Sequence, residues 1–430
     1  MSQQKKIIYL NIVIALLCLP IHYYMGEALK IAILPYVLFM LFSKNPNYFP
    51  ALIIHTIPGN TVCLVILFGC IWLALINFNI LKKYRVASIF SALIILLPVN
   101  LFFLYEGIFL KNMGFSLSLN YLGFYLSFFA FFYGILISAK INKNHWRAII
   151  LIVFLLPIIM YFPSPQKIVI RLFWLALPLA ITILASGFFQ SKLKLEVSLK
   201  IWSILFIIFI GIPYGLKFTP IFSAVLAITI LLFYLKGYKL LFNGLTTPKV
   251  GVIIGILIVL LINNIMDSSL HQASYQVGQE IVDFDSFMSY LKFKTIDDRA
   301  VIWKGGWDFI NNSSFYWPTG DVLSYSFYTV DGREIEDVEF GVHNLALELM
   351  RNYGMVIGFY LFSLYIIIIT KLNVVFKYCT SSFLLVFSAT LLGLGISESI
   401  VGQASLMPMF SFTFLGLIGI CFGIGKLKTI

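Results

Sequence analysis

Apolar residues in this chain form long continuous runs that are separated by mostly short polar segments. The runs fall at about 7–24, 28–42, 60–78, 87–110, 118–139, 148–162, 168–190, 201–214, 218–235, 250–266, 352–370, 382–399 and 408–425. Most of them approach the roughly 20 residues that a helix needs to cross a bilayer. Because backbone groups in lipid must satisfy their own hydrogen bonds, each run predicts a membrane helix.

The composition agrees with this pattern. Hydrophobic residues make up 60% of the 430 residues, charged residues only 11%, and the mean hydropathy is +0.97. Soluble domains carry about 25% charged residues. We therefore predict an all-α fold, a polytopic membrane helix bundle of about 12 transmembrane helices.

Basic residues fall in every second connection between the runs, which predicts the orientation of the chain. The clusters are Lys82, Lys83 and Arg85; Lys140, Lys143 and Arg147; Lys192, Lys194 and Lys200; Lys236, Lys239 and Lys249; Lys371 and Lys377; Lys426 and Lys428. The positive-inside rule places these connections and the C-terminus in the cytoplasm. Thirteen crossings would put Lys5 and Lys6 outside, so twelve crossings fit the charges better. The run 28–42, which contains Pro35, and the apolar stretch 49–58 leave the first 60 residues open.

The segment 267–350 is the one long polar part, and it predicts three regions: 1–266, 267–350 and 351–430. Within it, 267–342 holds 13 of the 18 acidic residues and 5 of the 30 basic residues. Its length is greater than that of an idle connection, and the orientation places it outside. Helical patterns at 299–311 and from near Val342 predict a partly helical cap, with turns at 318–321 and 331–333.

The net charge of +12 does not indicate nucleic-acid binding, because the bases lie between the apolar runs and not on a soluble basic face. Their position instead fits contact with membrane lipid. The five cysteines lie in or beside apolar runs and show no metal-ligand spacing. We predict neither a metal site nor a cofactor.

A few cations lie in or beside the spans on the side of the polar segment. Arg171 and Lys217 lie near the outer ends of two runs, and Arg351 lies at the outer end of a third. Intramembrane charges are costly and often functional, although each of these residues could simply extend to the interface. Their shared side predicts that they bind a lipid-linked phosphate or pyrophosphate.

Two patterns in the polar segment are candidates for chemistry. Arg299 and Trp303 are four residues apart and would share a helix face. The arginine could bind a diphosphate while the indole packs against a sugar, or the two side chains could simply stack on the surface. His343 and Asn344 lie where the segment meets the next span. The histidine could accept a proton from an attacking hydroxyl, or it could be a buried or capping residue. The asparagine could orient a sugar or cap a helix. Gly354, after these residues, begins a Gly-x-x-x-Gly pattern that permits close helix packing.

Together these motifs resemble the O-antigen polymerase and ligase family. The resemblance rests on Arg299-x-x-x-Trp303, then about 40 residues, then His343-Asn344-x-x-Leu-Glu with Gly-x-x-x-Gly opening the next span, and on the large loop before the last three spans. It implies a metal-independent glycosyltransferase with a GT-C-like bundle in the bacterial inner membrane, with its large loop in the periplasm. The implied donor is an oligosaccharide on undecaprenyl pyrophosphate, and a chain-length regulator is an implied partner.

Residue by residue, the resemblance implies that Arg299 holds the pyrophosphate and His343 activates or positions the acceptor hydroxyl. Ligases of the family usually carry an arginine in a Ser/Thr-rich turn at an earlier span, where this chain has Lys217. Lysine lacks the bidentate fork of arginine, although Arg171 could supply it. We therefore expect an O-antigen polymerase, with a ligase to the lipid A core as the alternative. A flippase or transporter is the third possibility, although the chain shows no clear internal repeat of the kind common in transporters.

Overall fold

A computed structural model describes residues 3–24, 27–56, 60–105, 115–161, 167–189, 193–211, 218–236, 303, 326–328, 334–336, 344–401 and 408–428. The packing of the chain divides it into two compact units. The first comprises Met1–Gly244, Ile368–Leu394 and Ala404–Ile430, and the second comprises Leu245–Ile367 and Gly395–Gln403.

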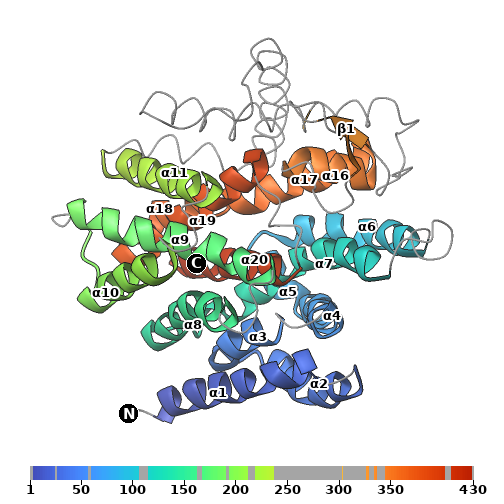
Figure 1. Ribbon diagram of the computed structural model, residues 1–430, viewed down its shortest axis with the longest axis horizontal. Coiled ribbons are helices and arrows are strands. Elements are labelled where there is room, and N and C mark those ends of the chain that lie inside the picture. Colours follow the sequence, from blue (N-terminus) through green and yellow to red (C-terminus); the bar gives the residue numbers. More distant parts are fainter. Residues whose placement is uncertain are drawn as a thin grey trace. The chain divides into compact units, whose positions relative to one another are not determined.

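The first unit is a bundle of helices, drawn from blue to red in Figure 1. They are α1 (Gln3–Tyr24), α2 (Glu27–Phe42), α3 (Phe49–His55), α4 (Asn60–Ile76), α5 (Phe78–Lys83), α6 (Ala87–Tyr105), α7 (Phe115–Ser138), α8 (Lys143–Tyr161), α9 (Lys167–Ala185), α10 (Val197–Phe206), α11 (Phe218–Leu235), α18 (Asn373–Tyr378), most of α19 (Ser382–Val401) and α20 (Pro408–Leu427). Shorter helical pieces are η1 (Pro46–Tyr48), η3 (Ser186–Phe189) and the π-helical η4 (Ile207–Gly211). The described parts of the other apolar runs are confirmed as helical, while 250–266 lies outside the described residues.

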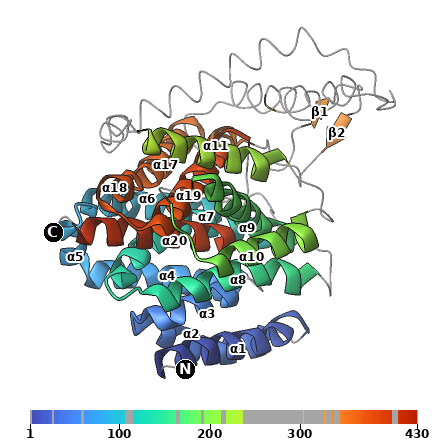
Figure 2. The same ribbon diagram turned by 90° about the vertical axis from the view of Figure 1, so that its left-hand side faces the viewer.

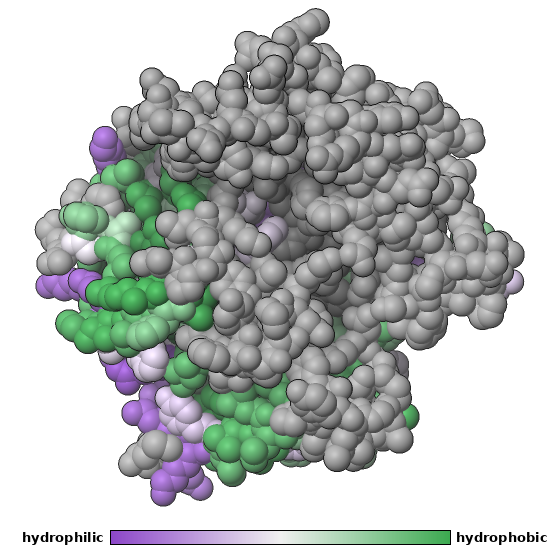
Figure 3. Space-filling view, viewed as in Figure 1, coloured by the Kyte–Doolittle hydropathy of each residue, from purple (hydrophilic) through white to green (hydrophobic). Residues whose placement is uncertain are grey.

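The described helices are those of a multi-pass membrane protein. Three are long and apolar enough to cross a bilayer: Met355–Tyr378, Ser382–Ile400 and Phe410–Leu427. Seven shorter apolar helices accompany them. Large apolar side chains such as Leu17, Ile95 and Phe209 are at least 65% exposed, and apolar residues cover a broad part of the described surface in Figure 3. Lipid, and not water, is the solvent that suits such a surface.

The pair α7 and α20 lies at the centre of the first unit. A Cβ added at Gly134 of α7 would come within 3.0 Å of the backbone of Gly416, and one at Gly419 of α20 would do the same at Phe131. Without Cβ atoms the two backbones approach closely, which is how membrane helices gain van der Waals contact where no hydrophobic driving force exists. Aromatic residues of α7, among them Phe128 and Tyr133, are fully buried around this contact.

The beginning of the chain resolves part of the uncertainty about its first 60 residues. The run 28–42 is helical as α2 and includes Pro35. Within the stretch 49–58, residues Phe49–His55 form α3, a wholly buried helix of 7 residues. At about 1.5 Å per residue this helix is far too short to cross a bilayer. It packs against α1, α2 and α8, so α3 is an internal helix of the bundle and not a span.

The described parts of the second unit contain α16 (Leu345–Tyr353), most of α17 (Met355–Thr370), the end of α19 and two short strands. Strands β1 (Ser326–Tyr328) and β2 (Glu334–Glu336) are antiparallel, with Ser326 opposite Glu336. The predicted helical cap did not include this hairpin. Phe327, Tyr328 and Ile335 are aromatic or β-branched, which favours strands, and the predicted turn at 331–333 falls between the strands in the sequence, outside the described residues. The predicted turn at 318–321 lies outside the described residues.

Candidate functional site

The start of α16 is the best-defined part of the predicted site. Asn344 has an extended backbone, with φ −148° and ψ 117°, and is the N-cap of α16. Its Oδ1 accepts a hydrogen bond from the backbone N–H of Leu347 at 3.1 Å. Its Nδ2 donates to the carbonyl of Ile400, at the end of α19, at 2.8 Å. The fully buried amide therefore caps one helix and ties it to another.

This cap corrects the predicted start of the second loop helix. The prediction began the helix near Val342, whereas α16 begins at Leu345. The extended conformation of Asn344 is the reason, because an N-cap residue lies outside the helical backbone geometry. His343 is therefore the residue that precedes the cap, and its own placement lies outside the described residues.

Arg351 lies in a buried ion pair one turn further along α16. Its Nη2 is 2.5 Å from Oε1 of Glu348, and the two side chains are 4% and 3% exposed. Charges buried to this extent are stable only when they are paired. The carboxylate offsets the charge of the guanidinium, so the pair as a whole attracts an anion less strongly than an isolated arginine would.

Two glycines shape the turn from α16 into α17. Gly354 has φ 77°, a conformation that L side chains rarely adopt, and it ends α16. A Cβ at Gly358 would come within 3.0 Å of the backbone of Leu349 and Met350. Close packing of α17 on α16, which the Gly-x-x-x-Gly pattern predicted, is thus confirmed at Gly358.

Trp303 is the one residue of the stretch 299–311 that the structure describes. It is helical, and its side chain is 2% exposed. Its indole Nε1–H has no hydrogen-bond partner among the described residues. A buried donor without a partner costs free energy comparable to a lost hydrogen bond, and a polar ligand such as a sugar would remove that cost.

The side chains of the other predicted site residues lie outside the described part of the structure. Arg299, His343 and Lys217 lie outside the described residues. Arg171 lies on α9 in the first unit, and only its backbone is described. The prediction that Arg171 and Lys217 bind a lipid-linked phosphate or pyrophosphate therefore stays a prediction. Within the described ranges no three His, Cys, Asp or Glu residues are grouped as metal ligands.

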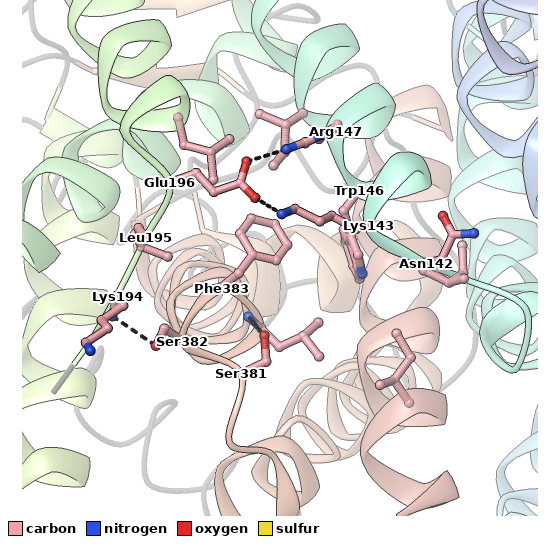
Figure 4. Close-up of a pocket in the computed structure, with 15 residues that line it drawn as sticks. Asn142, Lys143, Trp146, Arg147, Lys194, Leu195, Glu196, Ser381, Ser382 and Phe383 are labelled. Atoms are coloured by element: carbon pink, nitrogen blue, oxygen red, sulfur yellow. Dashed lines mark hydrogen bonds and ion pairs between the residues drawn. The ribbon is translucent and has the colours of Figure 1, made fainter. Parts of the chain in front are cut away.

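The first unit contains a cavity that the sequence did not predict. The cavity, of about 400 Å³, is lined by residues that begin α8, α10 and α19, among them Lys143, Arg147, Glu196 and Ser382 (Figure 4). Lys143 and Arg147 were interpreted only as markers of orientation, and Glu196 and Ser382 were not singled out. Their convergence depends on how distant segments pack, and no local pattern in the sequence reports that.

No family model, no curated protein and no solved structure matches this chain.

Proposed function

We propose that this protein is an O-antigen polymerase, a metal-independent membrane glycosyltransferase that joins oligosaccharide repeat units carried on undecaprenyl pyrophosphate. The proposal includes a GT-C-like bundle with 12 crossings in the bacterial inner membrane and the segment 267–350 in the periplasm. The described helices and their exposed apolar surface support the membrane setting. The motifs with Arg299, Trp303, His343 and Asn344 support the chemistry.

The observation that carries the proposal is the double anchoring of Asn344. Its amide caps α16 and holds the end of α19, so the residue next to His343 has a fixed backbone and a buried side chain. The N-terminus of a helix carries a partial positive charge that favours anions. A histidine that directly precedes such a cap is well situated to act beside a diphosphate.

The proposed reaction needs no cofactor, because the sugar pyrophosphate is already an activated donor. A hydroxyl oxygen of the acceptor glycan forms a new bond to the anomeric carbon of the donor sugar. The bond from that carbon to the pyrophosphate oxygen breaks, and undecaprenyl pyrophosphate leaves with the electron pair. His343 accepts the hydroxyl proton, and Arg299 stabilises the negative charge that develops on the leaving group.

Trp303, Arg171 and Lys217 bind the substrate in this proposal. The buried indole N–H of Trp303 donates to the glycan. Arg171 and Lys217 neutralise phosphates of the lipid carrier. Arg351, which is paired with Glu348, supports the site from α16. Membrane lipid surrounds the site, and a chain-length regulator is the proposed protein partner.

The test is the surface polysaccharide of a strain from which the gene is deleted. We expect lipid A core that bears a single repeat unit, because units are made and ligated but not joined. His343→Ala and Arg299→Ala should fail to restore the polymer ladder while inserting at normal levels. The matched controls are His271→Ala and Arg333→Ala in the same segment, which should restore it.

Other outcomes would favour the remaining candidates. Bare core with accumulated lipid-linked polymer would indicate the ligase. Loss of all periplasmic repeat units would indicate a flippase or transporter. A normal ladder in the deletion strain would remove the polymerase and the ligase alike.

A further inference from the structure

The cavity of the first unit lies where three helices begin. Two of the basic clusters, those with Lys143 and with Lys194, lie at these helix starts. The lining of the cavity includes Lys143 and Arg147 from α8, Lys194 and Glu196 from the segment before α10, and Ser382 from α19. In Figures 1 and 2 α8, α9 and α10 lie side by side, which agrees with their packing contacts. The cavity is thus built from segments that are far apart in the sequence and fixed by the bundle.

The charged groups of the cavity leave an excess of positive charge. Glu196 lies between two cations: its Oε2 is 2.9 Å from Nη2 of Arg147, and its Oε1 pairs with Nζ of Lys143 (Figure 4). Hydrogen bonds from Lys143 and Arg147 lower the pKa of Glu196, so it stays ionised. Lys194 is exposed and has no acidic partner in the described part of the chain. Three bases against one acid make the cavity attractive to an anion.

Two hydroxyl groups face the same space from the start of α19. Ser382 accepts a hydrogen bond from the backbone N–H of Lys194 at 3.1 Å, and Ser381 accepts one from the N–H of Leu384 at 3.5 Å. In both bonds the hydroxyl oxygen is the acceptor, so each O–H proton is left to donate. Hydroxyl donors beside lysine and arginine are the groups that bind phosphate oxygens.

The rest of the lining is apolar and belongs to helices with surfaces that suit lipid. Trp146, Phe383 and Leu199 form part of the wall, and in Figure 4 the ring of Phe383 is drawn below the ion pair of Glu196 with Lys143. Beyond the cavity, apolar side chains of α10 such as Ile201 and Ile204 are 51% and 45% exposed. A ligand with a phosphate at one end and an acyl chain at the other therefore matches both parts of the surface.

We propose that this cavity binds the headgroup of an anionic phospholipid, with its phosphate among Lys143, Arg147, Lys194 and Ser382 and its acyl chains along α10. By the positive-inside rule this end of the bundle lies at the cytoplasmic leaflet, where anionic lipids supply the negative charge. Glu196 competes with the phosphate for the two cations of α8. The lining of the cavity includes none of the proposed catalytic residues, and the site does not depend on the polymerase proposal.

The test measures lipid binding to the purified full-length protein by native mass spectrometry in maltoside detergent. Dioleoyl phosphatidylglycerol should bind more tightly than dioleoyl phosphatidylcholine, which has the same chains and no net charge. Lys194→Ala should weaken binding of the anionic lipid about fivefold, which corresponds to about 1 kcal/mol per lysine near a charged lipid. Glu196→Gln should tighten it, because the competing carboxylate is gone.

Lys83→Ala is the matched control, because Lys83 is an exposed lysine in another basic cluster that does not line the cavity. The affinity of the Lys83→Ala protein for both lipids should equal that of the wild type. Equal losses in Lys83→Ala and Lys194→Ala, or weaker binding in Glu196→Gln, would overturn the proposal. So would displacement of the anionic lipid by millimolar inorganic phosphate, because a free anion would then be the ligand.

Discussion

At the scale of single residues, His145 shows how a polar side chain is held neutral inside the first unit. It lies in the first turn of α8, before the apolar run 148–162, and is fully buried. Its Nδ1 accepts from the backbone N–H of Asn142 at 3.0 Å. The proton is therefore on Nε2, which donates to Oδ1 of Asn47 at 2.7 Å. Burial lowers the pKa of His145 to about 4.

This lowered pKa predicts a loss of stability in mild acid. The unfolded chain takes up a proton near pH 6.5, whereas the folded protein resists it down to about pH 4. The contribution of neutral His145 to the free energy of unfolding is fully present above pH 6.5. It falls as the pH drops toward 4, by up to about 1.4 kcal/mol per pH unit. Thermal unfolding in detergent should show the fall, and His145→Gln should flatten it. An unchanged pH dependence in His145→Gln would contradict the burial and the lowered pKa of His145 described above.

Asn344 offers a second prediction at this scale. Asn344→Ala removes the cap of α16 and the bond to Ile400, and loss of a cap alone costs about 1 kcal/mol. Asn344→Asp keeps an acceptor for the N–H of Leu347 but loses the donor to Ile400. Amide hydrogen exchange at the start of α16 should increase strongly in the alanine variant. In the aspartate variant the exchange at Leu347 should stay closer to the wild type, and equal exchange in both would show that the cap does not anchor the helix.

The residue scale also shows what the sequence could and could not tell about the candidate site. The motif with Asn344 predicted either a sugar contact or a helix cap, and the cap is what the structure shows. The ion pair of Arg351 with Glu348 was not predicted, although the two lie three residues apart on one helix face. The reason is that burial decides whether such a pair forms, and burial depends on the packing of the second unit.

At the scale of elements, the apolar runs predicted the described membrane helices well, because hydrophobic length is the strongest constraint in lipid. The ends of the helices were predicted less accurately than the helices themselves. α8 begins at Lys143 and not at the apolar run, since Asn142 accepts from the backbone N–H groups of Asn144 and His145 and so caps the helix among polar residues. The buried α3 could not be told from a span, because a short apolar run looks the same in both settings.

Close packing of α7 and α20 gives a prediction for the elements. Gly419→Ala places a Cβ within 3.0 Å of the backbone of Phe131, so one helix has to shift. We expect a loss of about 1–3 kcal/mol, as in other overpacked cores, visible as a lower midpoint of thermal unfolding. Gly187→Ala is the control, because its nearest neighbour, Nζ of Lys200, is 3.9 Å away. Equal midpoints for the two variants would show that α7 and α20 are not in close contact.

At the scale of the whole molecule, topology is the feature that the sequence predicts and that helix bounds alone do not fix. The predicted twelve crossings would place both termini and Lys83 in the cytoplasm and the segment 267–350 in the periplasm. The short buried α3 removes 49–58 as a further crossing, while the choice of twelve crossings over thirteen rests on the basic residues. Single cysteines at Ser286 and Lys83, in a chain without its five native cysteines, should be labelled by an impermeant maleimide in intact spheroplasts at Ser286 and only after lysis at Lys83. Labelling of both in intact spheroplasts would refute this topology.

The most direct measurement of the central claim is glycan transfer by the purified protein. The full-length chain in proteoliposomes is incubated with an undecaprenyl-pyrophosphate-linked repeat unit from its own host, with a chelator present. We predict lipid-linked products that grow by whole repeat units, with one undecaprenyl pyrophosphate released for each bond formed and none for His343→Ala. Absence of products from the wild-type protein, or equal products from His343→Ala, would contradict the account.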